Sequence, residues 1–285
     1  MKREAPAKVN LTLDILGKRE DGYHEMRMVM QTISLCDTVT VEETAGGFAL
    51  ETEGDFIPAG KKTLEQQAAE HFFAAAGVPM PGLRVRLEKR TPAYAGLGGG
   101  SADVAALLRI LRDRYAPEMP VAELERIGLL VGSDMPFCVR GGTALAEGRG
   151  EVLTDLPALP ACVFVLCKPE FGIPTGNLFA LVDGGELQFR PDTDGMMAAL
   201  ERGDLEGVAA RLGNVFEEVL PEEFHEVFAI KKRLLELGAM NAAMSGSGPT
   251  VFGIFREMAQ AEVAAAALRE QYEQTYVALP VKKLG

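Results

Sequence analysis

A glycine-rich stretch at residues 92–103 has the composition of a phosphate-binding loop. Four of the five residues from 96 to 100 are glycine, and apolar residues then recur at helical spacing. Glycine lets the backbone approach an anion closely, and we expect a helix from Ser101 whose unpaired N–H groups and positive dipole end attract phosphate. The residues of this predicted site are Pro92, Gly96, Leu97, Gly98, Gly99, Gly100 and Ser101.

Two better-known phosphate loops do not fit this sequence. A dinucleotide fingerprint that starts at Gly96 requires glycine at 101, and one that starts at Gly98 requires a small residue where Asp103 stands. A Walker A loop fails because Lys62 stands where serine or threonine is required. A plain strand-to-helix turn rarely needs so many glycines. The stretch therefore indicates a phosphate site of another class.

A second glycine element lies near the C-terminal end, at residues 244–255. Gly246 and Gly248 alternate there with two serines and lead into an apolar, strand-like run. Alone, such a mixture is equally typical of a linker or a hairpin turn. It becomes informative only together with the first loop.

The first half of the chain alternates between predicted strands and predicted helices. Apolar residues at every second position indicate strands at residues 9–15, 39–41 and 83–87. Helical spacing indicates helices at residues 63–76, 101–114 and 121–131. The first helix carries a capping box, Thr63 with Gln66, and a stop at Gly77. A sheet with interleaved helices would therefore position the glycine loop.

A proline-bearing stretch at residues 156–160 indicates a boundary between two domains, residues 1–155 and residues 156–285. Apolar runs in the second domain indicate strands at residues 161–167 and 250–255. Helical candidates lie at residues 196–200, 205–212 and 224–237. The predicted fold class is α+β.

Composition excludes several functional classes. The chain has 285 residues, 47% of them hydrophobic and 25% charged, and no run approaches the roughly 20 apolar residues that cross a bilayer. Its formal net charge of −12 disfavours nucleic acid, which needs a clustered basic face. The four cysteines suggest neither a disulfide framework nor a metal site, and the alternating N-terminus is not a signal peptide. We expect a cytoplasmic protein that binds no membrane.

Together, the two glycine elements resemble the paired motifs of the GHMP kinases, the superfamily of galactokinase, homoserine kinase and mevalonate kinase. The resemblance implies a two-domain fold, with a mixed sheet and helices in the N-terminal domain and a smaller ferredoxin-like C-terminal domain. It also implies that the first loop wraps the phosphates of ATP and that Gly246 and Gly248 help to close the site. ATP chemistry implies Mg²⁺, for which Ser101 and Asp134 are candidate ligands and neither is assigned.

Further motifs are similar to one branch of this superfamily, whose substrate is a cytidine diphosphate-linked methylerythritol phosphorylated at its 2-hydroxyl. They lie in the expected order at residues 5–11, 17–25, 132–137, 141–144, 148–151 and 214–217. The resemblance thus implies two small-molecule substrates and a place in the non-mevalonate isoprenoid pathway. Two positions depart from the pattern, because Ala102 replaces a common serine and Tyr94 replaces a small residue.

In this branch the residues matching Lys8 and Asp134 form the catalytic pair. Asp134 would accept the proton of the substrate hydroxyl, while Lys8 would keep that carboxylate ionised and offset charge on the phosphoryl group. By residue type alone, Lys8 is a solvated strand residue and Asp134 a turn residue. Their catalytic roles therefore rest on the resemblance.

Tyr23 and His24 suit a nucleobase pocket, because an aromatic ring stacks on cytosine and an imidazole hydrogen-bonds its polar edge. The resemblance places Phe179 on the opposite face of the base, and Asn10 and Thr175 at further substrate contacts. The ordinary alternative is a half-buried aromatic and a surface histidine at a turn.

Two other functions stay open at this point. A homoserine or mevalonate kinase would share both loops, but its alcohol carries no base for Tyr23 to stack on. A nucleotide sensor without turnover would share the fold and would not need Lys8 and Asp134. Monomer and dimer are equally compatible with the sequence.

Overall fold

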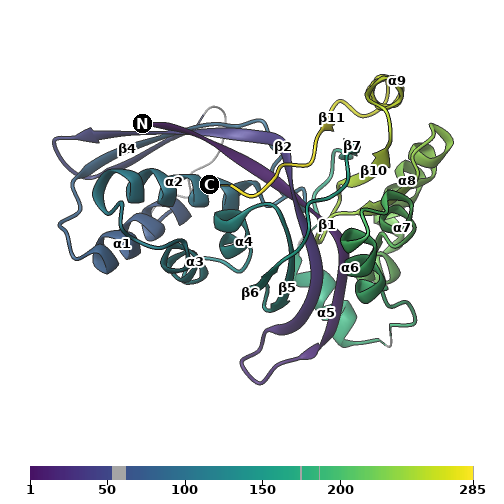
Figure 1. Cartoon of the computed structure of the whole chain (residues 1–285), viewed down its shortest axis with the longest axis horizontal. Coiled ribbons are helices and arrows are strands. Elements are labelled where there is room, and N and C mark those ends of the chain that lie inside the picture. The colour runs from purple at the N-terminus through teal and green to yellow at the C-terminus, as the bar shows by residue number, and fades with distance from the viewer. Residues whose placement is uncertain (53–61, 174, 186, 285) are drawn as a thin grey trace.

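A long antiparallel hairpin runs through the molecule. The computed structural model describes residues 1–52, 62–173, 175–185 and 187–284, with the backbone alone at residue 175. Strands β1 (Lys2–Lys18) and β2 (His24–Thr44) pair along nearly their whole length, and Figure 1 shows them crossing from the N-terminal helices to the C-terminal half. The predicted strands at residues 9–15 and 39–41 are confirmed within this hairpin.

Around the hairpin a mixed sheet of seven described strands forms, in the order β3-β4-β2-β1-β8, with β5 on β2 and β6 on β5. The added strands are β3 (Phe48–Thr52), β4 (Gly82–Glu88), β5 (Thr143–Gly148), β6 (Val152–Asp155) and β8 (Gly213–Asn214). β3 on β4 and β8 on β1 are parallel pairs, whereas the hairpin and β5 pair antiparallel. The sheet thereby joins strands from both halves of the chain.

Four helices lie together on one side of this sheet (Figure 1). They are α1 (Leu64–Ala76), α2 (Gly99–Tyr115), α3 (Val121–Leu129) and α4 (Met135–Arg140). The α1 capping prediction is confirmed, since Thr63 Oγ1 accepts a 3.2 Å hydrogen bond from the amide of Gln66 and Gly77 ends the helix in a left-handed conformation. Phe72 and Leu107 are fully buried in the core between helices and sheet.

The predicted start of the second helix was wrong by two residues. α2 begins at Gly99 rather than Ser101, because Gly98 adopts the left-handed conformation (φ 68°) and its carbonyl already accepts the amide of Ala102. The glycine loop and the first helical turn therefore overlap, and the amides of Gly99, Gly100 and Ser101 belong to that first turn.

The second half of the chain contains a ferredoxin-like unit. Its sheet has four described strands in the order β11-β7-β10-β9, all antiparallel. These strands are β7 (Val163–Cys167), β9 (Asn241–Met244), β10 (Val251–Phe255) and β11 (Thr275–Ala278). Its helices are α5 (Thr175–Asp183), α6 (Thr193–Glu201), α7 (Leu205–Ala210), α8 (Glu226–Glu236) and α9 (Met258–Arg269). Short 3₁₀ turns lie at Val215–Val219 and Glu222–Phe224. The predicted α+β fold is confirmed.

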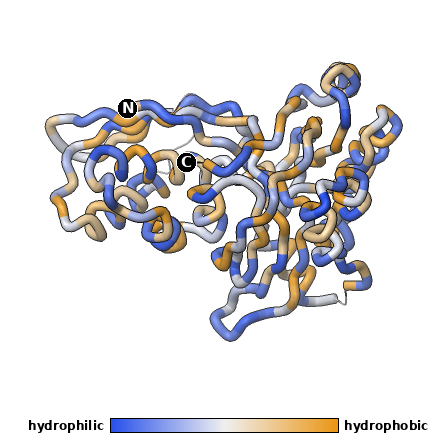
Figure 2. Tube along the Cα trace, viewed as in Figure 1, coloured by the Kyte–Doolittle hydropathy of each residue, from blue (hydrophilic) through white to orange (hydrophobic). Residues whose placement is uncertain are grey.

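Both halves of the chain share the hairpin. Val9 and Leu11 of β1 pack into the same buried cluster as Phe164 and Phe252 of the smaller sheet. The C-terminal segment crosses back, with the amide of Val281 bonded at 2.8 Å to the carbonyl of Thr32. Hydrophobic stretches occur along the strands and helices of both halves (Figure 2). The division of the chain between residues 155 and 156 stays a prediction.

In the described part of the chain, none of the helices has the length and apolar character needed to span a bilayer. All four cysteines are free thiols, and burial raises the pKa of Cys162 to about 12 and that of Cys167 to about 11.

Candidate active site

A cavity of about 730 Å³ brings most of the predicted site residues together. It is walled by β1, the hairpin turn, both glycine loops, the start of α4 and helix α5. The predicted residues that line it are Lys8, Asn10, Tyr23, His24, Gly96, Gly98, Asp134, Phe179, Gly246 and Gly248. Segments from residue 8 to residue 248 thus converge on one space, which is what an enzyme site for two substrates requires.

Lys8 and Asp134 form an ion pair within the cavity wall. Nζ of Lys8 lies 3.5 Å from Oδ2 of Asp134 and donates a 2.8 Å hydrogen bond to Oδ1 of Asn10. The Lys8 side chain is 4% exposed and that of Asp134 is 35% exposed. The ammonium is therefore buried, while the carboxylate beside it remains open to a ligand.

The pleat of β1 explains why these polar groups face the cavity. Residues of a strand point alternately to its two faces, so Lys8 and Asn10 lie opposite Val9 and Leu11, which enter the core. The register with β2 shifts on both sides of this pair, between Pro6 and Lys8 and again after Asn10. Such bulges commonly re-aim side chains beside active sites. Asn10 is fixed in turn by Met28, whose sulfur accepts from Nδ2 at 3.2 Å.

The first glycine loop is held against β1 by its backbone. The amide of Lys8 donates a 2.9 Å hydrogen bond to the carbonyl of Leu97. Gly96 and Gly98 both have positive φ, 73° and 68°, which a side chain would disfavour. The loop therefore presents bare backbone to the cavity immediately before the N-terminus of α2.

The two glycine elements touch one another, as the predicted pairing requires. Oγ of Ser245 donates a 3.0 Å hydrogen bond to the carbonyl of Gly96. A Cβ at Gly246 would lie 2.9 Å from that same carbonyl oxygen and 3.3 Å from Nζ of Lys8. Asn214 fixes the second loop from behind, because its Nδ2 donates to the carbonyls of Met244 and Gly246 at 2.8 and 2.7 Å.

A buried charge cluster under the first loop was not found from the sequence. Lys89 bridges Asp37 and Asp103, and its Nζ lies 2.5 Å from Oδ2 of Asp103. Asp37 also accepts hydrogen bonds from the amides of Arg90 and Thr91 at 2.6 and 2.7 Å, which fixes the strand end before the loop. Burial raises the pKa of Asp103 to about 7 despite Lys89, and the nearby Asp37 carboxylate adds to that rise.

The far end of the cavity is aromatic. The rings of His24 and Phe179 stack with centroids 4.5 Å apart, and Phe179 meets Phe216 edge to face at 5.0 Å. Nε2 of His24 lies 2.7 Å from Oδ1 of Asp183, the last residue of α5. Asp183 itself was missed from the sequence, because its contact with His24 spans 159 residues.

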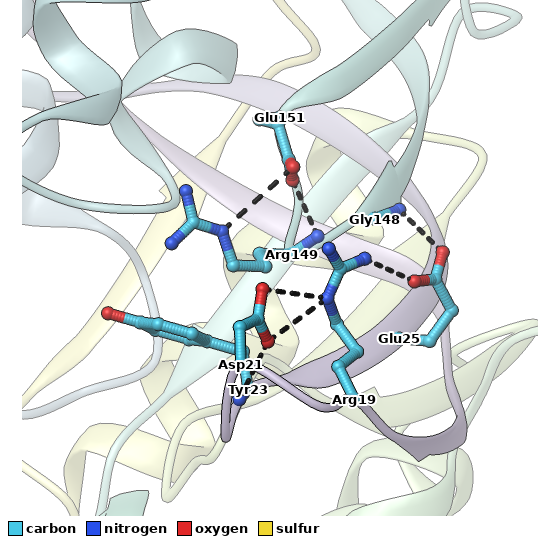
Figure 3. A network of polar contacts seen from close by, with 7 residues as sticks. All are labelled: Arg19, Asp21, Tyr23, Glu25, Gly148, Arg149 and Glu151. Atoms are coloured by element: carbon cyan, nitrogen blue, oxygen red, sulfur yellow. Dashed lines mark hydrogen bonds and ion pairs between the residues drawn. The ribbon is translucent and has the colours of Figure 1, made fainter.

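Tyr23 is placed by a network that joins two turns (Figure 3). Asp21 accepts a 3.1 Å hydrogen bond from the amide of Tyr23 and hydrogen bonds from Arg19. The guanidinium of Arg149, from the turn between β5 and β6, lies 4.5 Å from the centre of the Tyr23 ring. The phenol ring is thus held on one side by a cation.

The remaining predicted residues lie near the cavity without lining it. Among the described lining residues, Pro92, Leu97, Gly99, Gly100 and Ser101 do not occur. Leu97 is buried, whereas Gly99, Gly100 and Ser101 form the first turn of α2. Thr175 begins α5, and its side chain lies outside the described part of the structure.

The two departures from the family pattern have different surroundings. Tyr94 is 85% exposed, lines the cavity mouth with positive φ (50°), and leaves the glycines of the loop in place. Ala102 is buried inside α2. For a metal, the described residues contain no group of three or more acidic, histidine or cysteine side chains close enough to hold an ion.

Comparison with known proteins finds matches in both halves of the chain. The model for the GHMP kinases N terminal domain matches residues 63–142, and the model for GHMP kinases C terminal matches residues 196–274. Both glycine elements fall within these matches. A homoserine kinase structure from Cytophaga hutchinsonii superposes with a TM-score of 0.77 at 16% identity and shows the shared fold.

More similar relatives carry one name. The 4-diphosphocytidyl-2-C-methyl-D-erythritol kinase of Pelotomaculum thermopropionicum is 46% identical over 96% of this chain and 95% of its own. The kinase of that name from Clostridium botulinum (strain Kyoto / Type A2) is 38% identical over 97% of this chain and 99% of its own. A crystal structure of 4-(cytidine 5'-diphospho)-2C-methyl-D-erythritol kinase covers both chains completely with a TM-score of 0.83 and 34% identity. The chain therefore belongs to the 4-diphosphocytidyl-2-C-methyl-D-erythritol kinase family of the GHMP kinases, a family of ATP-dependent kinases.

Proposed function

We propose that this chain transfers the γ-phosphoryl group of ATP to the 2-hydroxyl of 4-diphosphocytidyl-2-C-methyl-D-erythritol. The observation that carries the proposal is the Lys8–Asp134 pair, which lies in one cavity between two glycine loops and an aromatic end. The relatives named for this substrate share nearly the whole chain. The reaction would belong to the non-mevalonate route to isoprenoid precursors.

Asp134 acts as the general base in this proposal. Its open carboxylate accepts the proton of the 2-hydroxyl as the hydroxyl oxygen bonds to the γ-phosphorus of ATP. The bond between the γ-phosphorus and the bridging β–γ oxygen breaks, and its electron pair leaves with ADP. Asp134 sits in the N-cap position of the short helix α4, so its backbone is fixed while its carboxylate faces Lys8.

Lys8 supplies the fixed positive charge. Its ammonium is buried, and its bonds to Asn10 and Asp134 hold it at one position, so no reorganisation is needed as charge develops on the phosphoryl oxygens. Nζ also lies 3.3 Å from a Cβ built at Gly246, which places the ammonium at the junction of both loops. We assign it to the transferring group.

The phosphates of ATP bind at the first glycine loop in this proposal. The first-turn amides of α2 at Gly99, Gly100 and Ser101 have no partner inside the helix, and they point toward the loop side with the positive end of the dipole. Gly96 and Gly98 allow close approach because they carry no side chain. Gly246 and Gly248 close the same space from the C-terminal side.

The site offers oxygen donors for the Mg²⁺ ion that usually accompanies ATP. The open carboxylate of Asp134 and the hydroxyl of Ser101 are oxygen donors of the type that Mg²⁺ prefers, and either would hold the ion together with phosphate oxygens and water. When bound, Mg²⁺ neutralises phosphate charge and orients the γ-phosphoryl group.

The cytosine of the substrate binds at the aromatic end. Tyr23 offers a ring for stacking, and His24, packed on Phe179 and bonded to Asp183, offers a fixed imidazole edge for the polar groups of the base. Asn10 and Thr175 remain assigned to further contacts with the substrate. An alcohol without a nucleobase, such as homoserine or mevalonate, would leave the aromatic end empty. This end therefore favours the proposed substrate over those two alcohols.

An ADP-release assay with Mg-ATP tests the substrate. We expect turnover with 4-diphosphocytidyl-2-C-methyl-D-erythritol and none with homoserine, mevalonate or galactose. Turnover on one of these other alcohols would overturn the cytosine assignment. ATP binding without turnover on any of them would support a nucleotide sensor instead.

Asp134→Asn tests the base. The amide keeps the size of the side chain and removes its capacity to accept the proton, so kcat should fall by about 10²–10⁴-fold. The dissociation constant of ATP should stay within a few-fold of the parent value. A variant with unchanged kcat would remove Asp134 from this role.

A further inference from the structure

The guanidinium of Arg149 occupies a position that the assigned roles do not explain. It lines the cavity beside Tyr23, with its side chain 25% exposed. Apart from His24, the described basic side chains that line the cavity are Lys8 and Arg149. Lys8 is already engaged with Asn10 and Asp134. Arg149 is thus the remaining strong cation of the site.

Two turns hold Arg149 in place (Figure 3). Its amide donates a 2.5 Å hydrogen bond to Glu151, whose carboxylate lies 3.9 Å from Nε. Glu25 ties the β5–β6 turn to the hairpin turn, because it accepts from the amide of Gly148 at 3.1 Å and from Arg19 at 2.5 Å. In Figure 3 the two terminal nitrogens of Arg149 point away from Glu151. These donors are therefore available on the side away from Glu151.

Arg149 lines the same cavity as Tyr23 and Asp134. On one side its guanidinium covers the ring of Tyr23 at 4.5 Å. On the other, a Cβ at the next residue, Gly150, would lie 3.5 Å from the carbonyl oxygen of Ser133, the neighbour of Asp134. Arg149 thus lies beside Tyr23, and the next residue of the chain lies beside the residue that precedes the proposed base.

We propose that Arg149 binds the diphosphate linker of the substrate and so selects for a cytidine diphosphate ester. The inference rests on the proposed function. In that substrate the diphosphate joins the cytosine to the reacting alcohol, and Arg149 lies over Tyr23 in the cavity that also holds Asp134. A guanidinium presents planar, paired donors that match phosphate oxygens, and charge-assisted bonds of this kind are the strong ones.

The charge of the surroundings makes such a cation necessary. The chain carries a formal net charge of −12, so a dianionic linker is repelled by the protein as a whole and needs local positive charge. Two carboxylates face Arg149, Asp21 and Glu151. Asp21 is engaged by Arg19 and by the amide of Tyr23, and Glu151 by the amide of Arg149. Because Asp21 and Glu151 are bonded to these other groups, the terminal nitrogens of Arg149 can donate to phosphate oxygens.

Binding of cytidine, CMP and CDP to Arg149→Met and to the parent protein tests the inference directly. For the parent we expect CDP to bind about ten-fold to a hundred-fold more tightly than cytidine, because it adds charge-assisted hydrogen bonds. In Arg149→Met this gain should disappear while cytidine affinity stays within a few-fold. Arg149→Lys should keep part of the gain, because a point charge replaces the fork. Equal affinity of the parent for cytidine and CDP would overturn the inference, as would a loss of cytidine and CDP affinity by the same factor.

Turnover gives a second and separate readout. Arg149→Met should raise KM for the cytidylated alcohol by about ten-fold or more with kcat within a few-fold and KM for ATP unchanged. Arg84→Met is the matched control, since Arg84 of β4 pairs with Glu51 of the neighbouring strand β3 and is 45% exposed. An unchanged KM in Arg149→Met would overturn the inference and leave the proposed function standing. If the parent fails to phosphorylate this alcohol, the proposed function fails, and the binding series still decides the role of Arg149.

Discussion

The side chain of Lys8 packs directly over Gly98. A Cβ at residue 98 would lie 3.0 Å from Cγ and 3.1 Å from Cε of Lys8. Gly98 also holds the left-handed conformation that lets α2 begin at the next residue. The position of the Lys8 ammonium and the start of α2, to which we assign catalysis and phosphate binding, therefore depend on the same missing side chain.

Gly98→Ala should impair both properties. The left-handed conformation costs an alanine about 1–2 kcal/mol, and the added methyl group displaces the stem of Lys8. We expect a lower free energy of unfolding in chemical denaturation and a kcat reduced by at least about ten-fold. Gly100→Ala is the matched stability control, because its Cβ would meet no atom within 4 Å and alanine favours a helix. Equal stability and kcat of Gly98→Ala and the parent would contradict the argument.

Lys8→Met should abolish most turnover with little change in fold. Methionine replaces the buried aliphatic stem of Lys8 but removes the charge beside Asp134 and the donor to Asn10. We expect kcat to fall by about 10²-fold or more, because fixed charge at the transferring group is lost. Lys8→Arg should also be poor, since its broader head must pass the same contact with Gly98. The measurement is single-turnover ADP release, and parental rates in Lys8→Met would exclude its assigned role.

Periodicity predicted the elements with strong patterns and missed the weak ones. Thr63 and Gly77 marked both ends of α1 correctly, and alternation found β1 and β4. β9 reads Asn-Ala-Ala-Met and has no β-branched residue, and β5 reads Thr-Ala-Leu-Ala-Glu-Gly and has only Thr143. Tertiary pairing rather than local preference makes them strands.

The candidate site was predictable where residues lie in motifs and unpredictable where distant segments meet. The first glycine loop was found from its own composition, whereas the second loop, Lys8 and Asp134 were found through a family pattern. The structure brings them to one cavity. Asp183 contacts His24 although 159 residues separate them in the sequence. Lys89, which follows β4, contacts Asp37 of β2 and Asp103 of α2. Local sequence patterns cannot predict such contacts, because the residues that make them are far apart in the chain.

Asp183→Asn should weaken substrate binding by releasing His24. The carboxylate holds the imidazole at 2.7 Å against Phe179, and a neutral amide holds it less firmly. We expect KM for the cytidylated alcohol to rise by several-fold, with kcat and KM for ATP nearly unchanged. Lys18→Met is the control, because Lys18 is the other partner of Asp183, at 2.6 Å, and its loss leaves the bond to His24 in place. The same rise in both variants would assign the effect to the loss of the Lys18–Asp183 ion pair rather than to the histidine.

Asp103 should make stability depend on pH in an unusual direction. Burial raises its folded pKa to about 7 from an ordinary value of 3.8, so between these values the folded protein binds a proton that the unfolded chain does not. The contribution of Asp103 to the free energy of unfolding therefore falls as pH rises from about 4 to about 7, and is constant above that range. Asp103→Asn cannot titrate and should lack this fall. The measurement is chemical denaturation of the parent and of Asp103→Asn at several pH values. The difference between their free energies of unfolding isolates Asp103, because the titration of other groups largely cancels. As pH rises to neutral, the parent should lose stability relative to Asp103→Asn. A difference that stays constant with pH would show that Lys89 keeps Asp103 ionised throughout.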